Sequence, residues 1–361
     1  MYTVHVNLDP RSYDIEIGSG NLRDVVKFCD AEQEDAHSVI ITDANIDDLY
    51  SEPVADALAE AGSEVDVLVV EPGEASKAAE VAAELWDQML DLGSDRKSVV
   101  IAVGGGVVGD LAGFVAATFA RGVRFVQVPT TLLAQVDSSV GGKVGINLPG
   151  GKNMVGAFWQ PRGVVIDVDV LQSLPDREYR AGLAEVVKYG VIQDVDFFAH
   201  LEVNVDPIHA REPKVLTGII ERCCRLKADV VEQDECDKTG LRAILNYGHT
   251  FCHAFEAATD YDQLLHGEGV AIGMMCAARL AQRMGRVDGE FVERQRALLE
   301  AFGLPLAVPE VEHDELIELM YRDKKVDRGK LRFVLPSRMG HVECVGDVQT
   351  DDIRAALAEQ S

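Results

Sequence analysis

Short apolar runs rich in β-branched residues alternate with helical segments through the first hundred residues of the chain. The runs cover residues 38–45, 64–74 and 98–106, and amphipathic segments lie between them. Such alternation is typical of a doubly wound parallel sheet with helices on both faces. The sequence therefore predicts an α/β, Rossmann-like domain whose ligands bind at the carboxyl ends of the strands.

The strand pattern fades near residue 170, and long helical patterns follow it. A chain of 361 residues is long enough for two separate hydrophobic cores. We therefore predict a Rossmann-like domain over residues 1–170 and a mainly helical domain over residues 171–361.

Charge and cysteine usage exclude several classes of protein. A net charge of −27 argues against a nucleic-acid partner, because phosphate binding needs a basic surface. High-salt adaptation and simple solubility are equally compatible with this acidity. No apolar run approaches the roughly 18 residues of a membrane helix, and the N-terminus lacks a signal-peptide layout. The seven cysteines show no CxxC spacing, so we expect reduced thiols in the cytoplasm.

A glycine motif follows the third strand run. Gly104, Gly106 and Gly109 fit G-x-G-x-x-G, and Asp110 precedes an apolar helical segment. Glycines let the backbone approach a pyrophosphate, and a helix N-terminus supplies amide donors. The motif follows the third unit instead of the first, and no acidic residue lies about twenty residues on, so a standard dehydrogenase domain is not indicated. A tight structural turn is an equally good interpretation.

A second glycine-rich stretch covers residues 124–158. It begins as a strand that ends at Thr130 and Thr131, and a loop is expected after it. The polar residues of that loop are Asp137, Lys143, Asn147, Lys152 and Asn153. Lysines and amides among glycines suit a phosphate or a polyol. A mobile surface loop is the alternative, although in so acidic a protein such a loop would be expected to carry Asp and Glu.

The second half of the chain places charges inside apolar helical patterns. Glu185 and Lys188 lie three residues apart among apolar neighbours on a helix expected over 177–192. Buried charges need a partner, a metal or a ligand. Lys227 lies in another apolar helix, over 215–235, whereas Lys324 lies in a basic stretch that could be a solvated face.

Three of the nine histidines crowd into residues 242–268. His249 and His253 are four residues apart on a predicted helix, and His266 follows. Histidines at i and i+4 project from the same side of a helix and commonly supply two zinc ligands. Spacing alone therefore suggests His249 and His253 with His266 or Glu185, and hydrogen-bonded core histidines are the alternative.

Seven motifs, in order and over essentially the whole chain, resemble the 3-dehydroquinate synthase family. They are GGGVVGDLAGFVAATFARG, VPTTLLAQVDSSVGGKVGIN, GKNMVGAFWQP, LAEVVKYG, LNYGHTFCHA, LLHGEGVAIGM and DKKVDRGKLRFVLP. The resemblance implies an NAD-dependent enzyme that requires zinc or cobalt. Its reaction would convert 3-deoxy-D-arabino-heptulosonate 7-phosphate (DAHP) into 3-dehydroquinate and phosphate.

The resemblance also implies roles for individual residues. The metal ligands fall on Glu185, His249 and His266, so that His253 faces the substrate instead. Substrate hydroxyls, carboxylate and phosphate are assigned to Asp137, Lys188, Lys227, Arg242, Lys324, Lys143, Asn153, Asn246 and His253. NAD contacts fall on Asp43, Asn45, Glu74, Lys77, Gly105, Gly106, Asp110, Thr130, Thr131, Lys143 and Lys152. Arg121 resembles the arginine that reaches the phosphate from a neighbouring subunit, which implies a homodimer.

In this family NAD first oxidises the substrate, and phosphate is then lost. The resulting NADH returns its hydride in the same turnover, and an intramolecular aldol reaction closes the ring. Related enzymes remain as alternatives: sugar phosphate cyclases of the 2-deoxy-scyllo-inosose or valiolone type, and metal-dependent glycerol-type dehydrogenases. One departure is Cys252, because the family motif usually reads H-T-F-G-H. A larger side chain there could shift the packing of its helix, but it changes no assigned role, so we interpret it as a tolerated change. We also hypothesise that this thiol can be oxidised.

Overall fold

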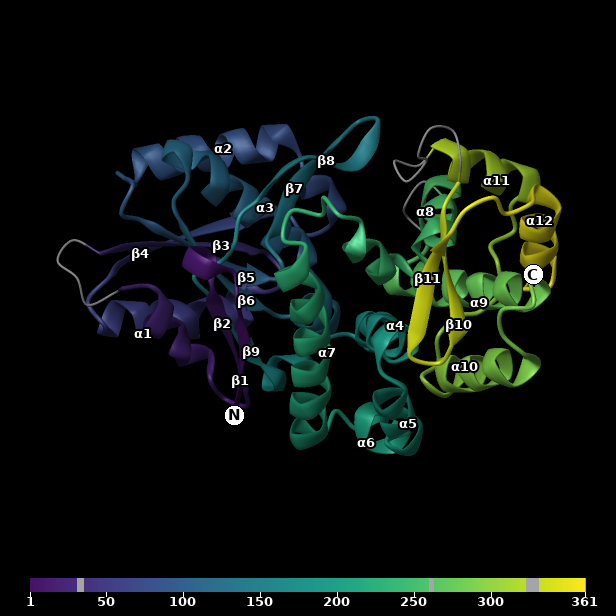
Figure 1. Cartoon of the computed structure of the whole chain (residues 1–361). Coiled ribbons are helices and arrows are strands. Elements are labelled where there is room, and N and C mark those ends of the chain that lie inside the picture. The colour runs from purple at the N-terminus through teal and green to yellow at the C-terminus, as the bar shows by residue number, and fades with distance from the viewer. Residues whose placement is uncertain (31–35, 260–262, 323–330, 361) are drawn as a thin grey trace. The chain divides into compact units, whose positions relative to one another are not determined.

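The computed structural model describes residues 1–30, 36–259, 263–322 and 331–360, and the chain divides into two compact units. The first unit comprises Met1–Leu174 and Pro213–Cys236. The second comprises Pro175–Glu212 and Asp237–Ser361. Figure 1 shows the helices and strands of each unit, coloured along the chain.

Within the described residues, the first unit is built on a seven-stranded sheet with the order β1-β2-β9-β6-β5-β3-β4. β1 pairs antiparallel with β2, and the other neighbours are parallel. The strands are β1 (Tyr2–Val6), β2 (Tyr13–Gly18), β3 (His37–Asp43), β4 (Glu64–Val70), β5 (Val99–Gly104), β6 (Arg124–Pro129) and β9 (Gly163–Asp167). The prediction of a parallel, Rossmann-like sheet is confirmed.

Helices cover both faces of this sheet, which explains why its strands are continuous apolar runs. Val39 and Ile41 of β3 pack with α2 (Ala79–Asp91) and α3 (Gly106–Thr118). Ile40 points to the opposite face and packs with α1 (Glu52–Glu60). The chain runs from β3 to the edge strand β4 and then returns to the other side of β3 as β5. This reversal creates a topological switch point at the carboxyl ends of β3 and β5.

The first unit also contains a long helix from the second half of the sequence. Helix α7 (Pro213–Gln233) packs against β1 and β2. Glu232 of α7 accepts a hydrogen bond from the backbone N–H of Asn7 (3.0 Å), and Glu235 pairs with Arg11 (2.7 Å). The sequence prediction placed everything after residue 170 in the second domain. The structure divides the chain at Leu174 instead and assigns α7 to the sheet, because the apolar face of this helix is buried there.

The stretch expected to be a loop after Thr131 contains an antiparallel hairpin, so that expectation was wrong for residues 143–158. Its strands are β7 (Lys143–Leu148) and β8 (Gly151–Phe158). The glycines serve close strand pairing here instead of loop flexibility. A Cβ atom on Gly156 would lie 2.2 Å from the carbonyl oxygen of Val144. A short helical turn over Ala134–Ser138 precedes the hairpin.

The second unit is mainly helical, as predicted. Its helices are α4 (Asp176–Gln193), α5 (Val195–Val203), α6 (Val205–His209), α8 (His249–Ala258), α9 (His266–Arg283), α10 (Gly289–Ala301), α11 (His313–Arg322) and α12 (Thr350–Ala358). A two-stranded sheet of β10 (Phe333–Arg338) and β11 (His341–Val345) joins them. Helix α9 packs against α4, α8, α10 and α12 and is buried over nearly its whole length. In the part of the chain that the structure describes, no helix is long and apolar enough to cross a membrane.

Candidate active site

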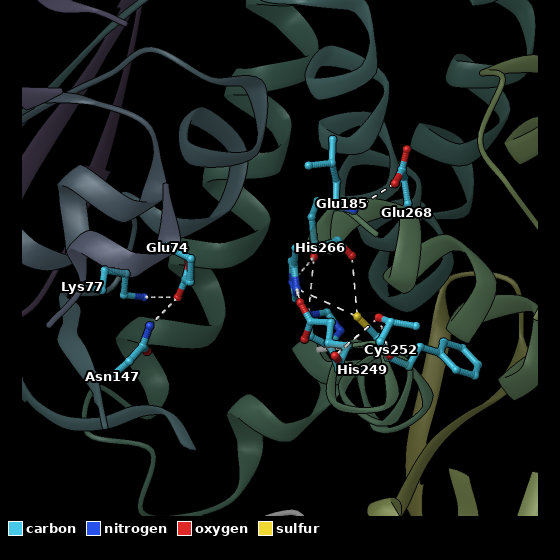
Figure 2. Close-up of polar contacts among 12 residues, drawn as sticks. Glu74, Lys77, Asn147, Glu185, His249, Cys252, His266 and Glu268 are labelled. Carbon is cyan, nitrogen blue, oxygen red and sulfur yellow. Dashed lines mark hydrogen bonds and ion pairs between the residues drawn. The ribbon is translucent and has the colours of Figure 1, made fainter. Parts of the chain in front are cut away.

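A cluster in the second unit combines one carboxylate with two imidazoles. Glu185 projects from the middle of α4, and His249 and His266 are the first residues of α8 and α9 (Figure 2). The Oε1 atom of Glu185 lies 3.4 Å from Nε2 of His249 and 3.7 Å from Nε2 of His266. Glu185 and His249 are buried, whereas the His266 side chain is 36% exposed. Three helices therefore bring their donor atoms together at one point that stays accessible on the His266 side.

This donor set fits a divalent transition metal. Zinc bonds to histidine nitrogen and carboxylate oxygen are about 2.0–2.2 Å long, so tetrahedral ligands lie about 3.4 Å apart. The ligand atoms of Glu185, His249 and His266 lie within 4.8 Å of one another. Three protein ligands leave at least one coordination position open, which is typical of a catalytic site and not of a structural one.

Hydrogen bonds and neighbouring charges determine the protonation states of His249 and Glu185. His249 Nδ1 lies 3.1 Å from the carbonyl oxygen of Tyr247, which only accepts, so Nδ1 carries the proton and Nε2 keeps its lone pair. Burial lowers the pKa of His249 to about 4, against the opposing effect of Glu185, so this imidazole is neutral. Burial alone would raise the pKa of Glu185. The ammonium of Lys188 and the two imidazoles outweigh it and hold that pKa well below its usual value.

The pKa of His266 is shifted in the opposite direction from that of His249. Burial by itself would lower it, but contacts with Cys252, Glu185 and Glu256 outweigh burial and raise it well above its usual value. A metal ion at this ring therefore competes with a proton for the same nitrogen.

Glycines allow the ligand-bearing helices to approach each other. Gly248 precedes His249 with φ +82°, a conformation that L side chains rarely adopt. A Cβ atom on Gly273 of α9 would lie 2.2 Å from the carbonyl oxygen of Gly248. One on Gly267 would lie 1.9 Å from the carbonyl oxygen of Ala181 in α4. Backbone contact at these points brings the starts of α8 and α9 to Glu185.

Sequence reasoning missed residues that position the candidate metal ligands. Glu268 accepts a hydrogen bond from the backbone N–H of Leu265 (2.9 Å) and caps the start of α9. Both oxygens of Glu268 pair with Arg177 of α4 at 2.8 and 2.7 Å. The signal was present, because a glutamate at the third position of a helix is a capping signature. Glu256 contacts His266 at 3.2 Å, and nothing in the spacing distinguishes it from a surface residue.

Cys252 is buried beside the cluster, and its packing explains how the larger side chain is accommodated. A Cβ atom on Gly269 would lie 2.8 Å from its sulfur, so the absence of a side chain at residue 269 makes room for the thiol. Burial raises the pKa of Cys252. Reactive cysteines need a lowered pKa and access to solvent, so the structure argues against the hypothesis that this thiol is readily oxidised.

Two other predicted substrate residues of the second unit lie on α8 or in the segment just before it. Arg242 lies in a short helical segment over Leu241–Asn246 and is 3% exposed. His253 follows His249 by one turn of α8, and their ring centroids are 5.8 Å apart. His253 belongs to neither group of candidate metal ligands found in the described residues. Lys324 lies outside those residues.

In the first unit, the predicted cofactor residues Glu74, Lys77 and Asp110 lie together. The Nζ atom of Lys77 is 2.7 Å from Asp110, 3.5 Å from Glu74 and 2.5 Å from Oδ1 of Asn153. Burial alone would lower the pKa of Lys77, but Asp110 and Glu74 outweigh it and raise that pKa. The ammonium is therefore charged although it is 4% exposed. Asn153, which sequence reasoning assigned to a phosphate, thus lies beside these residues. The Nδ2 atom of Asn147 donates a hydrogen bond to Oε1 of Glu74 (2.8 Å; Figure 2).

The remaining predicted cofactor residues follow the ends of neighbouring strands. Asp43 ends β3 and accepts a hydrogen bond from the backbone of Asn45 (2.9 Å). Gly105 and Gly106 connect β5 to α3, and Thr130 and Thr131 follow β6. A Cβ atom on Gly105 would lie 3.0 Å from the Thr131 side chain, so glycine keeps the backbone open at this point. This is the edge of the sheet where ligands of doubly wound folds bind.

Asp137 and Lys227, both predicted to contact substrate, form a pair in the first unit. The Nζ atom of Lys227 lies 3.0 Å from Oδ2 of Asp137 and donates a hydrogen bond to its backbone carbonyl (2.6 Å). Lys143 and Lys152 lie on the hairpin strands β7 and β8. Arg121 is exposed and follows α3 with φ +71°.

Comparison with known proteins identifies strong similarities over the whole chain. The family model described as 3-dehydroquinate synthase N-terminal matches residues 67–181, and the model described as 3-dehydroquinate synthase C-terminal matches residues 182–326. A 3-dehydroquinate synthase from Rhodopirellula baltica is 49% identical, over 98% of this chain and 96% of that protein. One from Desulforamulus reducens is 50% identical, over 99% and 100%.

Solved structures of related cyclases share the fold. A 2-deoxy-scyllo-inosose synthase in complex with carbaglucose-6-phosphate, NAD+ and Co2+ is 28% identical, with a TM-score of 0.91 and full coverage of both chains. A 2-epi-5-epi-valiolone synthase from Streptomyces hygroscopicus subsp. jinggangensis, with NAD+ and Zn2+ bound, is 29% identical. Its TM-score is 0.89, over 98% of this chain and 99% of that one.

Proposed function

The chain belongs to the 3-dehydroquinate synthase family, and from that premise we propose how its residues carry out the reaction. The protein is an NAD- and divalent-metal-dependent lyase that converts DAHP into 3-dehydroquinate and phosphate, in the shikimate pathway of aromatic amino acid biosynthesis. The observation that carries the residue assignments is the cluster of Glu185, His249 and His266, whose ligand atoms lie within 4.8 Å of one another.

These three residues hold the metal ion, either zinc or cobalt. When bound, the ion supplies Lewis-acid polarisation of a substrate hydroxyl, and NAD supplies a reversible acceptor for the hydride. Glu185 contributes the one negative charge of the ligand set, which offsets part of the charge of the ion. The outer hydrogen bond from His249 to Tyr247 is of the kind that fixes a ligating ring (3.1 Å).

Buried cations bind and orient the substrate. Lys188 is held against Glu185 and, with Asp137, binds substrate hydroxyls. Lys227 and Arg242 bind the carboxylate, a role also assigned to Lys324. Each buried cation costs desolvation energy, which an anionic ligand offsets. Lys143, Asn153, Asn246 and His253 bind the phosphate. The enzyme thereby positions a flexible anion and neutralises its charge, which accounts for much of the catalysis by such sites.

NAD binds at the switch point of the sheet. Support comes from the glycines at the start of α3, where backbone amides favour a pyrophosphate, and from the charged group Glu74, Lys77 and Asp110. The other residues of this site are Asp43, Asn45, Gly105, Gly106, Thr130, Thr131, Lys143 and Lys152. The first unit therefore supplies the cofactor site, and the second supplies the metal ligands.

We also propose that the enzyme is a homodimer in the cytoplasm. Arg121 is exposed and ends the short helical turn Phe119–Arg121 with a left-handed backbone conformation (φ +71°). In the proposal this guanidinium reaches the phosphate in a neighbouring subunit. The seven free cysteines are compatible with a reducing compartment.

A single assay distinguishes the proposed activity from that of a dehydrogenase or an inosose-type cyclase. DAHP, NAD and Zn2+ are mixed with the protein, and phosphate release and NADH absorbance are followed together. Phosphate without accumulated NADH is expected, because the cofactor is regenerated in each turnover. Stoichiometric NADH would indicate a dehydrogenase. Turnover of a sugar phosphate that lacks a carboxylate, in preference to DAHP, would indicate a cyclase of the inosose type.

A further inference from the structure

The second nitrogen of His266 has a partner of its own. Nε2 of this ring faces Glu185, and Nδ1 lies 3.2 Å from Oε1 of Glu256. Glu256 is on α8, two helical turns after His249, and it is 5% exposed. A carboxylate only accepts hydrogen bonds, so this contact requires a proton on Nδ1. A neutral His266 ring then carries its lone pair on Nε2, toward Glu185.

We propose that Glu256 is a positioning residue for the metal site: its carboxylate holds the tautomer and the ring orientation of His266. The inference rests on the metal ligands proposed above. Metal-bound histidines almost always donate their other N–H group to a carboxylate, a carbonyl or water. His249 has such a partner in the carbonyl of Tyr247 at 3.1 Å. Glu256 supplies the equivalent partner for His266, and with a full negative charge it also raises the basicity of the ring.

Cys252 contacts the same histidine, mainly at its backbone. Its sulfur lies 3.6 Å from the carbonyl oxygen of His266 and 3.9 Å from Nδ1 (Figure 2). The thiol is on the turn of α8 before Glu256, and it is completely buried. The first residue of α9 is therefore restrained at its ring by Glu256 and at its backbone by Cys252.

The same three groups could in principle bind a second metal ion, because a cysteine, a carboxylate and an imidazole form a ligand set. The chemistry of His266 decides against it. A neutral imidazole has one lone pair, and a metal held by Nε2 leaves the proton on Nδ1. A second ion on Nδ1 would require the loss of that proton as well. We therefore expect one metal ion per chain.

Metal affinity tests the proposal without reference to turnover. Zinc dissociation constants of the apo protein are measured by competition with a chromophoric chelator, for the wild type, Glu256→Gln and Glu256→Ala. Loss of such an outer partner typically weakens metal binding about 10–100-fold, which we expect for Glu256→Ala. Glu256→Gln keeps the shape and a neutral acceptor oxygen, so its affinity is expected to lie between the other two. Visible spectra of the Co2+ forms report any change in ligand geometry.

Two further variants separate the possible failures. Glu185→Ala removes a proposed ligand, and Glu290→Ala removes an exposed glutamate of α10 as the matched control. Weak binding by Glu185→Ala with wild-type binding by Glu256→Ala and Glu256→Gln would overturn the positioning role alone. Unchanged binding by Glu185→Ala would overturn the metal site itself. Two zinc ions in the wild type and one in Glu256→Ala would identify a second site and also overturn the proposal.

Discussion

The ion pair of Glu185 and Lys188 leads to a prediction about stability that depends on whether the metal is bound. Both side chains are 1% exposed, and their charged groups are in direct contact within α4. Lys188→Met removes the ammonium and keeps a chain of similar length. Removing one partner of a buried ion pair typically costs about 3–5 kcal/mol, because the other charge stays buried without compensation. The pKa of His266, which lies 3.7 Å from Glu185, is raised, and a proton on that ring offsets part of this loss. We therefore expect a loss near 3 kcal/mol.

The corresponding change in the unfolding midpoint is large enough to measure. One kcal/mol shifts the midpoint by about 2–4 °C for a domain of roughly 150–250 residues, so apo Lys188→Met should unfold roughly 6–12 °C below the apo wild type. Saturating zinc should narrow this gap, because the ion supplies the positive charge that Glu185 has lost. Thermal unfolding is recorded by calorimetry for both proteins, with chelator and with zinc.

Arg354→Met is the control in the same unit, since Arg354 pairs with Asp314 on the surface (2.7 Å). Exposed pairs contribute little, so its midpoint should match the wild type in both conditions. The reasoning would be refuted if apo Lys188→Met unfolded within about 2 °C of the wild type, or if zinc left its deficit unchanged.

Three further predictions concern the same helices. Glu185→Ala should lose bound zinc on dialysis whereas His253→Ala should retain it and lose turnover, and equal zinc loss in both would contradict the ligand assignment. Gly269→Ala should destabilise the protein by about 1–3 kcal/mol in denaturant titrations, because the new methyl meets the Cys252 sulfur at 2.8 Å. Adding Cys252→Ala should restore most of that loss, and additive losses would disprove the clash. Zinc affinity should rise as pH increases above about 6.5, since neighbouring groups outweigh burial and raise the pKa of His266, whose proton the metal displaces. Calorimetry in two buffers measures that proton release, and an affinity independent of pH would count against it.

The alternation of strands and helices was sufficient to predict the sheet, because side-chain periodicity reflects local geometry. It did not predict that α7 packs with the first unit. An amphipathic helix buries its apolar face equally well against helices or a sheet, and contacts such as that of Glu232 with Asn7 are remote in sequence. The glycines of β7 and β8 were misinterpreted for a related reason. Glycine permits both flexibility and close approach of two backbones, and only the partner strand decides between them.

The metal cluster shows where spacing is an incomplete guide. His249 and His253 are neighbours on one face of α8, as their spacing predicts, with rings 5.8 Å apart. Three-dimensional packing decides which other donors reach them. Glu185 comes from α4, and the contact of α4 with α9 depends on the glycine at residue 267. Local periodicity contains no information about such a contact, whereas the resemblance to a family does.

Burial of positive charge marks the candidate site better than the number of charges does. The chain carries a net charge of −27, with 61 aspartates and glutamates against 34 lysines and arginines. Among the described residues, the buried lysines and arginines are Lys77, Lys188, Arg211, Lys227 and Arg242. Arg211 has a structural explanation, since it pairs with Asp176 at 2.7 Å and stacks on the ring of Tyr179. The other four are all residues proposed to bind cofactor or substrate. The three lysines among them also pair with carboxylates, Lys77 with Asp110, Lys188 with Glu185 and Lys227 with Asp137. A buried ion pair is seldom more stable than the apolar side chains that could replace it, so stability alone does not explain these pairs. Their retention is what binding an anionic sugar phosphate and a dinucleotide requires.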